Sequence, residues 1–236
     1  MTSPGQVAPQ VRNGASVEEA TIGEPRWPPA VALLLFVALN IALRLWLADR
    51  RVITLPWLLP ALEAVLLALL FVGQPARPAG RRRWVRPAVL VVVVVVLVLA
   101  ALWSTGLLVN DLIRGSRVTQ SPTKLLAIGG LTWLGNNLAF GLLYWLMDGG
   151  GPLARLRLTT PVDLAFTRQL SPEIAPSGWR PVFLDYLHLG FTNATAFSPT
   201  DVLPLTHRAK YTMLVHSTLA LALFGLIVAR AVNAFA

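Results

Sequence analysis

Long apolar runs recur along the chain, and they constrain its fold more than any other feature. They lie at about residues 27–48, 55–72, 87–109, 125–147 and 211–236. A helix needs about 20 consecutive apolar residues to cross the hydrocarbon core of a bilayer. Because lipid offers the backbone no hydrogen-bonding partner, a spanning segment must satisfy its own peptide groups as a helix. We therefore predict an all-α membrane protein with about five transmembrane helices.

Composition and charge favour the same class. Of the 236 residues, 55% are hydrophobic and 13% are charged, whereas soluble domains carry roughly a quarter charged residues. The net charge is +9, but the arginines cluster between the apolar runs, as in membrane proteins, and do not form the basic stripe of a nucleic-acid-binding domain. We predict a multi-pass protein of the plasma membrane that binds no nucleic acid and contacts anionic headgroups through Arg81, Arg82 and Arg83.

The chain divides into three regions. Residues 1–26 are rich in Gly, Pro, Ser and Glu, a composition that predicts a disordered polar tail. Residues 27–124 hold three apolar runs and are expected to form a three-helix membrane region. The third run contains six consecutive valines at 91–96, which would favour a strand in water, but in lipid the need for internal hydrogen bonds favours a helix.

Four polar side chains fall inside the apolar runs, where such groups are costly and commonly functional: Glu63, Asn136, Asn137 and His216. Two interpretations are open for each. Glu63 binds a proton or cation, or it is solvated near the interface or paired with Arg44. The two asparagines bond a neighbouring helix or line a polar cavity. His216 titrates as a gate or packs as a hydrogen-bonded side chain.

No constellation of residues indicates catalysis or metal binding. The chain has no Cys, so disulfides and thiolate sites are excluded. His188 and His207 lack further ligands at the spacing of a zinc site. No phosphate-binding loop or hydrolase motif is present. We therefore expect no enzyme, no metal and no cofactor.

Residues 191–206 read FTNATAFSPTDVLPLT. They align without a gap with the pore loop of potassium channels, which runs approximately FTTLTTVGYGDIxPxT. Phe191 and Thr192 match the end of the pore helix, and Thr195 matches a threonine at the foot of the filter. The segment that leaves the filter is matched by Asp201, Pro204 and Thr206.

The resemblance extends beyond this loop. The run after it, at 211–232, ends in ARAV and is similar to the inner pore helix of these channels. The resemblance implies a channel-like hairpin over 125–236, with an outer helix, a polar connection over 148–180, a re-entrant segment over about 183–205 and an inner helix. The chain also resembles small bacterial multi-pass membrane proteins of unknown activity.

The filter itself departs from the family pattern. Where the channels have TVGYG, this chain has AFSPT at 196–200. Ser198 and Thr200 replace the two glycines that permit the filter backbone, and Pro199 fixes one φ and removes an N–H. We therefore do not expect a selective potassium filter.

Two functional hypotheses follow from these observations. The first is a weakly selective ion-channel-like pore, formed by a homo-oligomer that is a tetramer by analogy, because one loop per chain cannot enclose a pore. The resemblance implies a pore lining of Thr192, Asn193, Thr195, Phe197, Ser198, Pro199, Thr200 and Asp201. The alternative is a non-conducting membrane scaffold or partner subunit whose hairpin is only structural. Orientation stays open, because the arginines at 77–86 place the N-terminus in the cytoplasm, whereas the resemblance implies the reverse.

Overall fold

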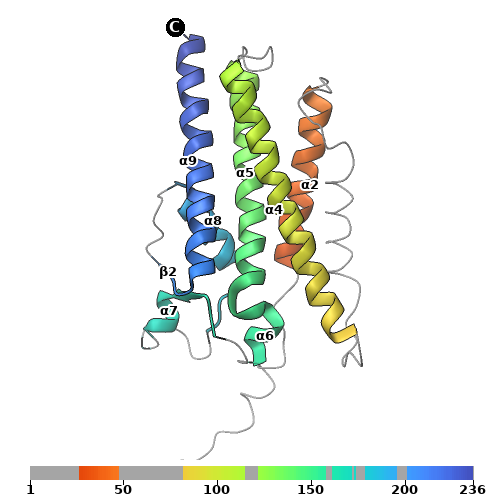
Figure 1. Ribbon diagram of the computed structural model, residues 1–236, viewed down its shortest axis with the longest axis vertical. Helices are drawn as coiled ribbons and strands as arrows, with labels where there is room; N and C mark the ends of the chain where they lie inside the picture. Colours follow the sequence, from red (N-terminus) through yellow and green to blue (C-terminus); the bar gives the residue numbers. More distant parts are fainter. Residues whose placement is uncertain are drawn as a thin grey trace, which may run out of the picture.

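The protein is a bundle of helices with a small two-stranded sheet at one end (Figure 1). The computed structural model describes residues 27–47, 82–114, 122–157, 161–171, 173, 179–195 and 201–235. The long helices of these ranges are α2 (Trp27–Leu47), α4 (Arg82–Arg114), α5 (Pro122–Met147) and α9 (His207–Phe235). Shorter elements lie between α5 and α9: η1 (Asp148–Gly150), α6 (Pro152–Arg157), β1 (Leu164–Phe166), α7 (Thr167–Leu170), α8 (Phe183–Thr195) and β2 (Val202–Pro204).

Three helical stretches in the described ranges have the length and apolar character to cross a membrane: Val94–Arg114, Thr123–Gly150 and His207–Arg230. They coincide with the third, fourth and fifth predicted spans. The first predicted span is also helical, as α2, and the apolar stretch Trp27–Leu39 is the continuous part of it whose side chains are described. The second predicted span and the predicted tail lie outside the described residues. The described residues are thus mostly helical and hold three candidate membrane spans, and the total of five stays a prediction.

The valine-rich run is helical, as predicted, within α4. Its apolar side chains divide into two faces with helical periodicity. One face packs into the bundle and comprises Val94, Leu97, Val98 and Ala101. The other face is exposed and comprises Val91, Val92, Val95 and Leu99. An exposed face this apolar is suited to lipid rather than to water.

Helix α5 is the centre of the bundle and contacts α2, α4, α8 and α9. Of its candidate span 61% is buried, against 38% for α4 and 28% for α9, so α5 is the most enclosed of the three. Its glycines explain this position. A side chain at Gly129 would collide with Ile227 of α9, and one at Gly135 would collide with Phe36 of α2, because each glycine leaves the space that its neighbour fills.

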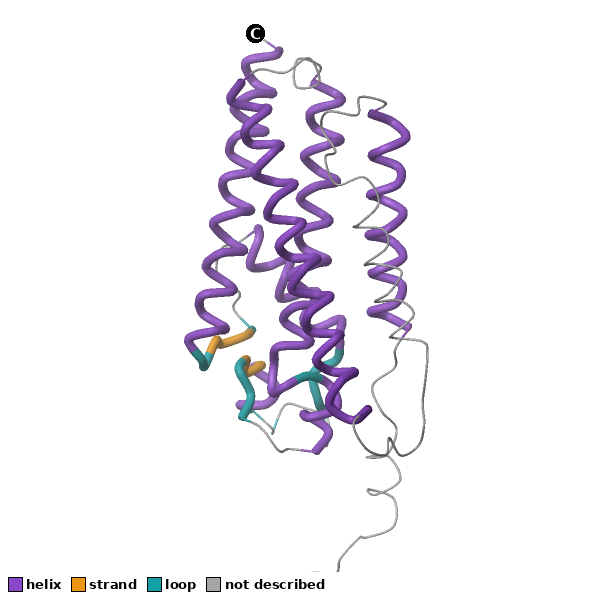
Figure 2. Tube along the Cα trace, turned by 45° about the vertical axis from the view of Figure 1, so that its right-hand side comes forward, coloured by secondary structure: helices purple, strands orange, loops and turns teal. Residues whose placement is uncertain are grey.

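The polar connection after α5 contributes one strand to a sheet that the sequence did not predict, and the other strand lies between α8 and α9. Strand β1 pairs antiparallel with β2, with Leu164 opposite Pro204 and Phe166 opposite Val202 (Figure 2). Strands of three residues are too short to show an alternating pattern. Since the two partners are almost 40 positions apart, only the tertiary fold brings them together.

Candidate functional site

The chain between α5 and α9 contributes the short helix α8 to the bundle. Helix α8 runs antiparallel to α5: near its start Tyr186 contacts Asp148 at the end of α5, and further along Phe191 packs edge-on against Trp133 with 5.4 Å between ring centroids. By Asp201 the chain is back at the first end, where the backbone N–H of Thr167 donates to the carbonyl of Asp201 at 2.9 Å. Helix α9 begins at this same end and runs to the opposite one (Figure 1).

Two glycines allow α8 to lie directly against α5. A Cβ at Gly141 would come 3.3 Å from the Cα of Leu187, and a Cβ at Gly190 would come 3.2 Å from the carbonyl oxygen of Asn137. Both neighbours are backbone atoms, so they cannot rotate away. Small residues at a helix crossing are typical of membrane bundles, where close backbone approach increases packing.

Polar side chains of three helices meet near the far end of α8. The amide Nδ2 of Asn193 donates to the carbonyl of Met213 at 3.0 Å and lies 3.5 Å from the hydroxyl of Tyr144. That hydroxyl lies 3.1 Å from Nδ1 of His216. The imidazole of His216 stacks on Phe140, with 4.1 Å between ring centroids and 1° between planes. All of these side chains are buried, so they connect α8, α5 and α9 inside the bundle.

The donors in this cluster can be put in order. An amide NH₂ only donates, so the oxygen of Tyr144 accepts from Asn193 and its O–H is left to donate to Nδ1 of His216. The imidazole then carries its proton on Nε2. That atom is buried without a hydrogen-bond partner among the described residues. This order uses both the oxygen and the O–H of Tyr144, whereas the other tautomer of His216 would leave that O–H without an acceptor in this cluster.

The two asparagines of α5 make different contacts. Nδ2 of Asn136 donates to the hydroxyl of Thr105 on α4 at 2.9 Å, which links the two helices. Nδ2 of Asn137 donates to the carbonyl of Trp133 in its own helix at 2.8 Å. The Oδ1 atom of Asn137 is buried without a partner in the described part of the chain. Asn136 thus bonds a neighbouring helix, which is one of the two interpretations left open for it. Both amides are buried inside a single chain.

Three glycines reverse the chain after α5. Gly149, Gly150 and Gly151 have φ angles of 57°, 77° and 93°, which side-chain-bearing residues rarely adopt. The reversal brings Arg155 back to the end of α5, where its Nη1 donates to the carbonyls of Trp145 and Asp148 at 2.7 and 2.8 Å. The guanidinium thereby supplies donors to two carbonyls at the helix end, and that of Asp148 also accepts the backbone N–H of Gly151 at 2.9 Å.

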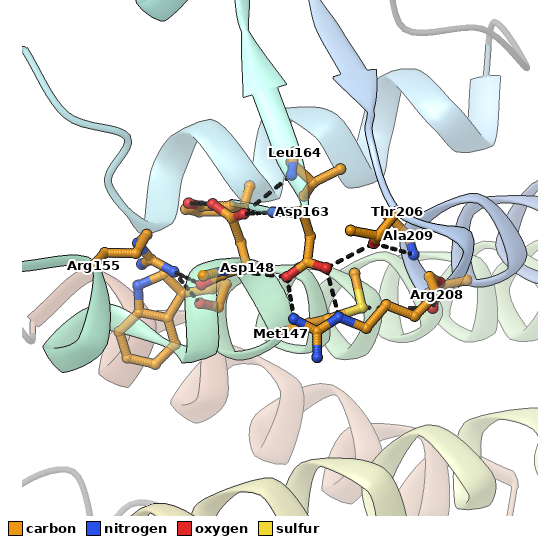
Figure 3. Close-up of polar contacts among 12 residues, drawn as sticks. Met147, Asp148, Arg155, Asp163, Leu164, Thr206, Arg208 and Ala209 are labelled. Carbon is orange, nitrogen blue, oxygen red and sulfur yellow. Dashed lines mark hydrogen bonds and ion pairs between the residues drawn. The ribbon is translucent and has the colours of Figure 1, made fainter. Parts of the chain in front are cut away.

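A buried carboxylate, Asp148, joins the start of the connection to β1 and α8 (Figure 3). Its Oδ1 accepts the backbone N–H of Asp163 at 2.7 Å and that of Leu164 at 3.1 Å. Its Oδ2 accepts the hydroxyl of Tyr186 at 2.5 Å. Both oxygens therefore have donors, as burial of a carboxylate requires.

A second buried carboxylate, Asp163, joins the connection to the start of α9 (Figure 3). It accepts the backbone N–H of Gly149 at 3.1 Å and the hydroxyl of Thr206 at 2.6 Å. Arg208 donates to both of its oxygens, through Nε and Nη2. Burial acts to raise the pKa of Asp163, but the hydrogen bonds from Arg208 and Thr206 outweigh it and hold the pKa below the usual range. Asp163 is thus ionised in the folded protein at neutral pH.

The two strands are held at both ends. At one end the N–H of Leu205 donates to the carbonyl of Asp163 at 2.8 Å, and at the other the N–H of Thr167 donates to the carbonyl of Asp201 at 2.9 Å. The carboxylate of Asp201 lies 3.6 Å from Nε2 of His188 on α8. We call the pair β1–β2 together with the Asp163–Arg208 contact the clip.

The predicted pore-lining residues are only partly described. Thr192 and Thr195 lie on the last turns of α8, where their hydroxyls donate to carbonyls of the same helix. Asn193 is buried among three helices, and Asp201 lies at the end of the clip next to α8. Residues 197–200 and Glu63 lie outside the described residues. Of the predicted headgroup contacts, Arg82 and Arg83 begin α4 and Arg81 falls outside.

The residues with the most contacts in this region were not predicted as functional. None of them belongs to a motif of closely spaced residues; they are Asp148, Asp163, Arg208, Tyr144 and Tyr186. The run Gly149–Gly150–Gly151 directly after Asp148 was the one local signal of a tight reversal there. Among the described residues no three His, Cys, Asp or Glu side chains are grouped as metal ligands would be.

No model of a known protein family matches this chain, and neither a curated protein nor a solved structure is significantly similar to it.

Proposed function

We propose that this chain is a multi-pass protein of the cell membrane whose region from α5 to α9 is the pore-forming hairpin of a weakly selective ion channel. Helix α5 is the outer helix of this hairpin, α8 is the short helix of a re-entrant segment, and α9 is the inner helix. Several copies of the chain are needed, because a single hairpin cannot enclose a pore.

The geometry of α8 is the observation that supports this proposal best. Its 13 residues extend over about 20 Å, which is less than the hydrocarbon core of about 30 Å. The chain enters α8 at the end of the bundle that holds Asp148, and by Asp201 it has returned there. A helix that enters the bundle partway and is followed by a return to the same end has the form of a re-entrant pore segment.

The face of α9 that is left uncovered in one chain is consistent with assembly. Beyond its first turn its exposed residues are apolar or small, and the large ones are Tyr211, Leu214, Val215, Leu221, Phe224, Val228 and Val232. In a membrane such a face packs against lipid or another helix. The oligomer proposed here places part of this face against neighbouring copies.

Weak selectivity follows from the residues that replace the potassium filter. Without the two glycines the backbone cannot present stacked carbonyl rings to a dehydrated ion. A cation that passes stays largely hydrated, so Na⁺ and K⁺ are discriminated weakly. The carboxylate of Asp201, partly exposed next to His188, supplies negative charge at the entrance.

Planar-bilayer recording of the purified full-length protein tests the proposal. We expect cation currents whose reversal potential in asymmetric NaCl and KCl shows little preference between the two cations. Native mass spectrometry of the same preparation is expected to show an oligomer. A monomer without conductance in any salt would refute the pore, and a strong preference for K⁺ would refute the account of its selectivity.

A second function is favoured by one specific contact. The side chain of Asn193 is directed into the packing between α5 and α9, and its amide is hydrogen-bonded there. This contact favours a non-conducting membrane scaffold or partner subunit whose hairpin is structural. Hydrogen exchange separates the two functions, because a water-filled vestibule makes the 192–201 amides exchange rapidly, whereas a packed interior protects them.

A further inference from the structure

The clip lies where the hairpin returns, and none of its side-chain contacts belongs to the predicted pore lining. Asp163 immediately precedes β1. It contacts Thr206, which lies just before α9, and Arg208, which lies in the first turn of α9. At the other end of the same two strands, the carbonyl of Asp201 accepts from Thr167. The three residue pairs of the sheet therefore lie between Asp163 and Asp201.

We propose that Asp163 is the positioning residue of the hairpin. Acting through the clip, it fixes Asp201 and the start of α9 relative to α8. The effect on ion flow rests on the function proposed above, whereas the effect on the structure does not.

The need for such a residue follows from the size of the sheet. A two-stranded sheet is marginal in water by itself, and here each strand has only three residues. Its order must come from groups that hold its ends. Asp163 receives four donors from three residues: Gly149 in the turn after α5, and Thr206 and Arg208 at the start of α9.

The Asp163–Arg208 contact also differs from an ordinary surface ion pair. The Arg208 side chain is 60% exposed, but that of Asp163 is fully buried. The guanidinium meets the carboxylate with two parallel hydrogen bonds, an arrangement that specifies orientation as well as attraction. Asp163→Asn turns one acceptor oxygen into a donor, so at least one of the converging N–H groups loses its partner in a buried place.

Distances between spin labels test the proposal on the full-length protein. The chain has no Cys, so a nitroxide pair can be placed at Leu184 of α8 and Leu203 of β2, both of which are 52% exposed. Labelled protein is reconstituted in nanodiscs with an excess of unlabelled protein, and the distance distribution is measured by pulsed electron resonance. The variants are Asp163→Asn and the milder Arg208→Lys. Lysine keeps the positive charge but cannot make the two parallel hydrogen bonds of the guanidinium.

The controls change the same chemistry outside the clip. Glu173→Gln removes an exposed carboxylate from the same connection, and Lys210→Gln removes an exposed cation from the first turn of α9. We expect one narrow distance for wild type and both controls, a broad distribution for Asp163→Asn and an intermediate one for Arg208→Lys. A wild-type distribution in Asp163→Asn overturns the proposal. If that variant does not fold, a wild-type distribution in Arg208→Lys overturns it.

Bilayer recording of the same variants separates this proposal from the proposed function. If wild type conducts, we expect Asp163→Asn to change the open probability about tenfold and to leave the current through a single open channel unchanged. If wild type conducts and Asp163→Asn changes neither the spin-label distances nor the open probability, the positioning role is overturned and the pore is not. If wild type does not conduct but Asp163→Asn broadens the distance distribution, the pore is overturned and the positioning role is supported.

Discussion

Single polar side chains act inside this bundle as connections between helices. Tyr144 joins Asn193 of α8 to His216 of α9, and Asn136 joins α5 to Thr105 of α4. In an apolar environment a polar atom without a partner is penalised. Each of these residues therefore affects how the helices pack, whatever the protein transports or binds.

Removing the hydroxyl of Tyr144 tests this role at one atom. We expect Tyr144→Phe to lower the free energy of unfolding by about 1 kcal/mol, because His216 and Asn193 each lose a partner. Thermal unfolding in detergent measures the change. Tyr211→Phe is the matched control, since this tyrosine is 67% exposed, and equal effects of the two substitutions would contradict the assignment.

The carboxylate of Asp163 gives stability a pH dependence of known sign. Its pKa is lower in the folded protein than the ordinary value of about 4. Its contribution is complete above that ordinary pKa and is lost as the pH falls through the lowered one. The stability difference between wild type and Asp163→Asn is thus expected to be constant near neutral pH and to narrow below about pH 4.

Unfolding of both proteins at a series of pH values in one detergent measures this difference. Subtraction removes the carboxyl groups that the two proteins share. Glu173→Gln, which changes an exposed carboxyl in the same connection, is expected to follow wild type throughout. A difference that widens toward acid would show that the sign is wrong.

Contact between backbones decides how closely α8 packs against α5. Gly190 of α8 and Gly141 of α5 are placed so that an added Cβ meets backbone atoms, whereas Gly130 of α5 faces open space. Substitution by alanine should therefore affect stability differently at Gly190 and at Gly130. Replacing a helical glycine by alanine reduces the conformational entropy lost on folding and so stabilises the helix. This gain requires that the added methyl group has room.

We expect Gly190→Ala to destabilise the protein by about 1–3 kcal/mol, because α8 must move away from α5. Gly130→Ala is expected to be neutral or to stabilise by up to about 1 kcal/mol. Thermal unfolding in detergent compares the two, and hydrogen exchange of α8 shows whether the loss is local. Gly190→Ala protein as stable as Gly130→Ala protein would mean that the crossing is looser than described.

At the scale of the whole molecule, the bundle holds two exposed charged residues, Glu173 and Lys124, far apart along the axis of α5. Helix α7, which ends three residues before Glu173, lies at the end where α9 begins (Figure 1), and Lys124 lies in the first turn of α5, at the other end. If α5 crosses the membrane, these two exposed residues face opposite sides. Their separation is a property of the fold and does not depend on the orientation of the protein.

Single cysteines at Glu173 and Lys124 test this arrangement in the otherwise Cys-free chain. In intact cells a membrane-impermeant maleimide is expected to label one of the two variants and to label the other only after permeabilisation. Which one is labelled gives the orientation that loop charges leave open. Labelling of both variants in intact cells would contradict a spanning α5.

The sequence by itself determined the features that depend on one segment and its solvent. Runs of apolar residues predicted the helices α4, α5 and α9, because in lipid the backbone has no alternative to a helix. The valines at 91–96 are helical for this reason, against their propensity in water.

Only the tertiary structure decided which side chains meet. Asp163 and Arg208 are 45 positions apart and Tyr144 and His216 are 72 apart, so no spacing rule connects them. The strands β1 and β2 are too short to carry a periodic signal, and they form because the ends of α5 and α9 bring them together. Polar residues in such a bundle choose their partners by proximity in space, since a buried donor or acceptor must bond to whatever the packing of helices places beside it.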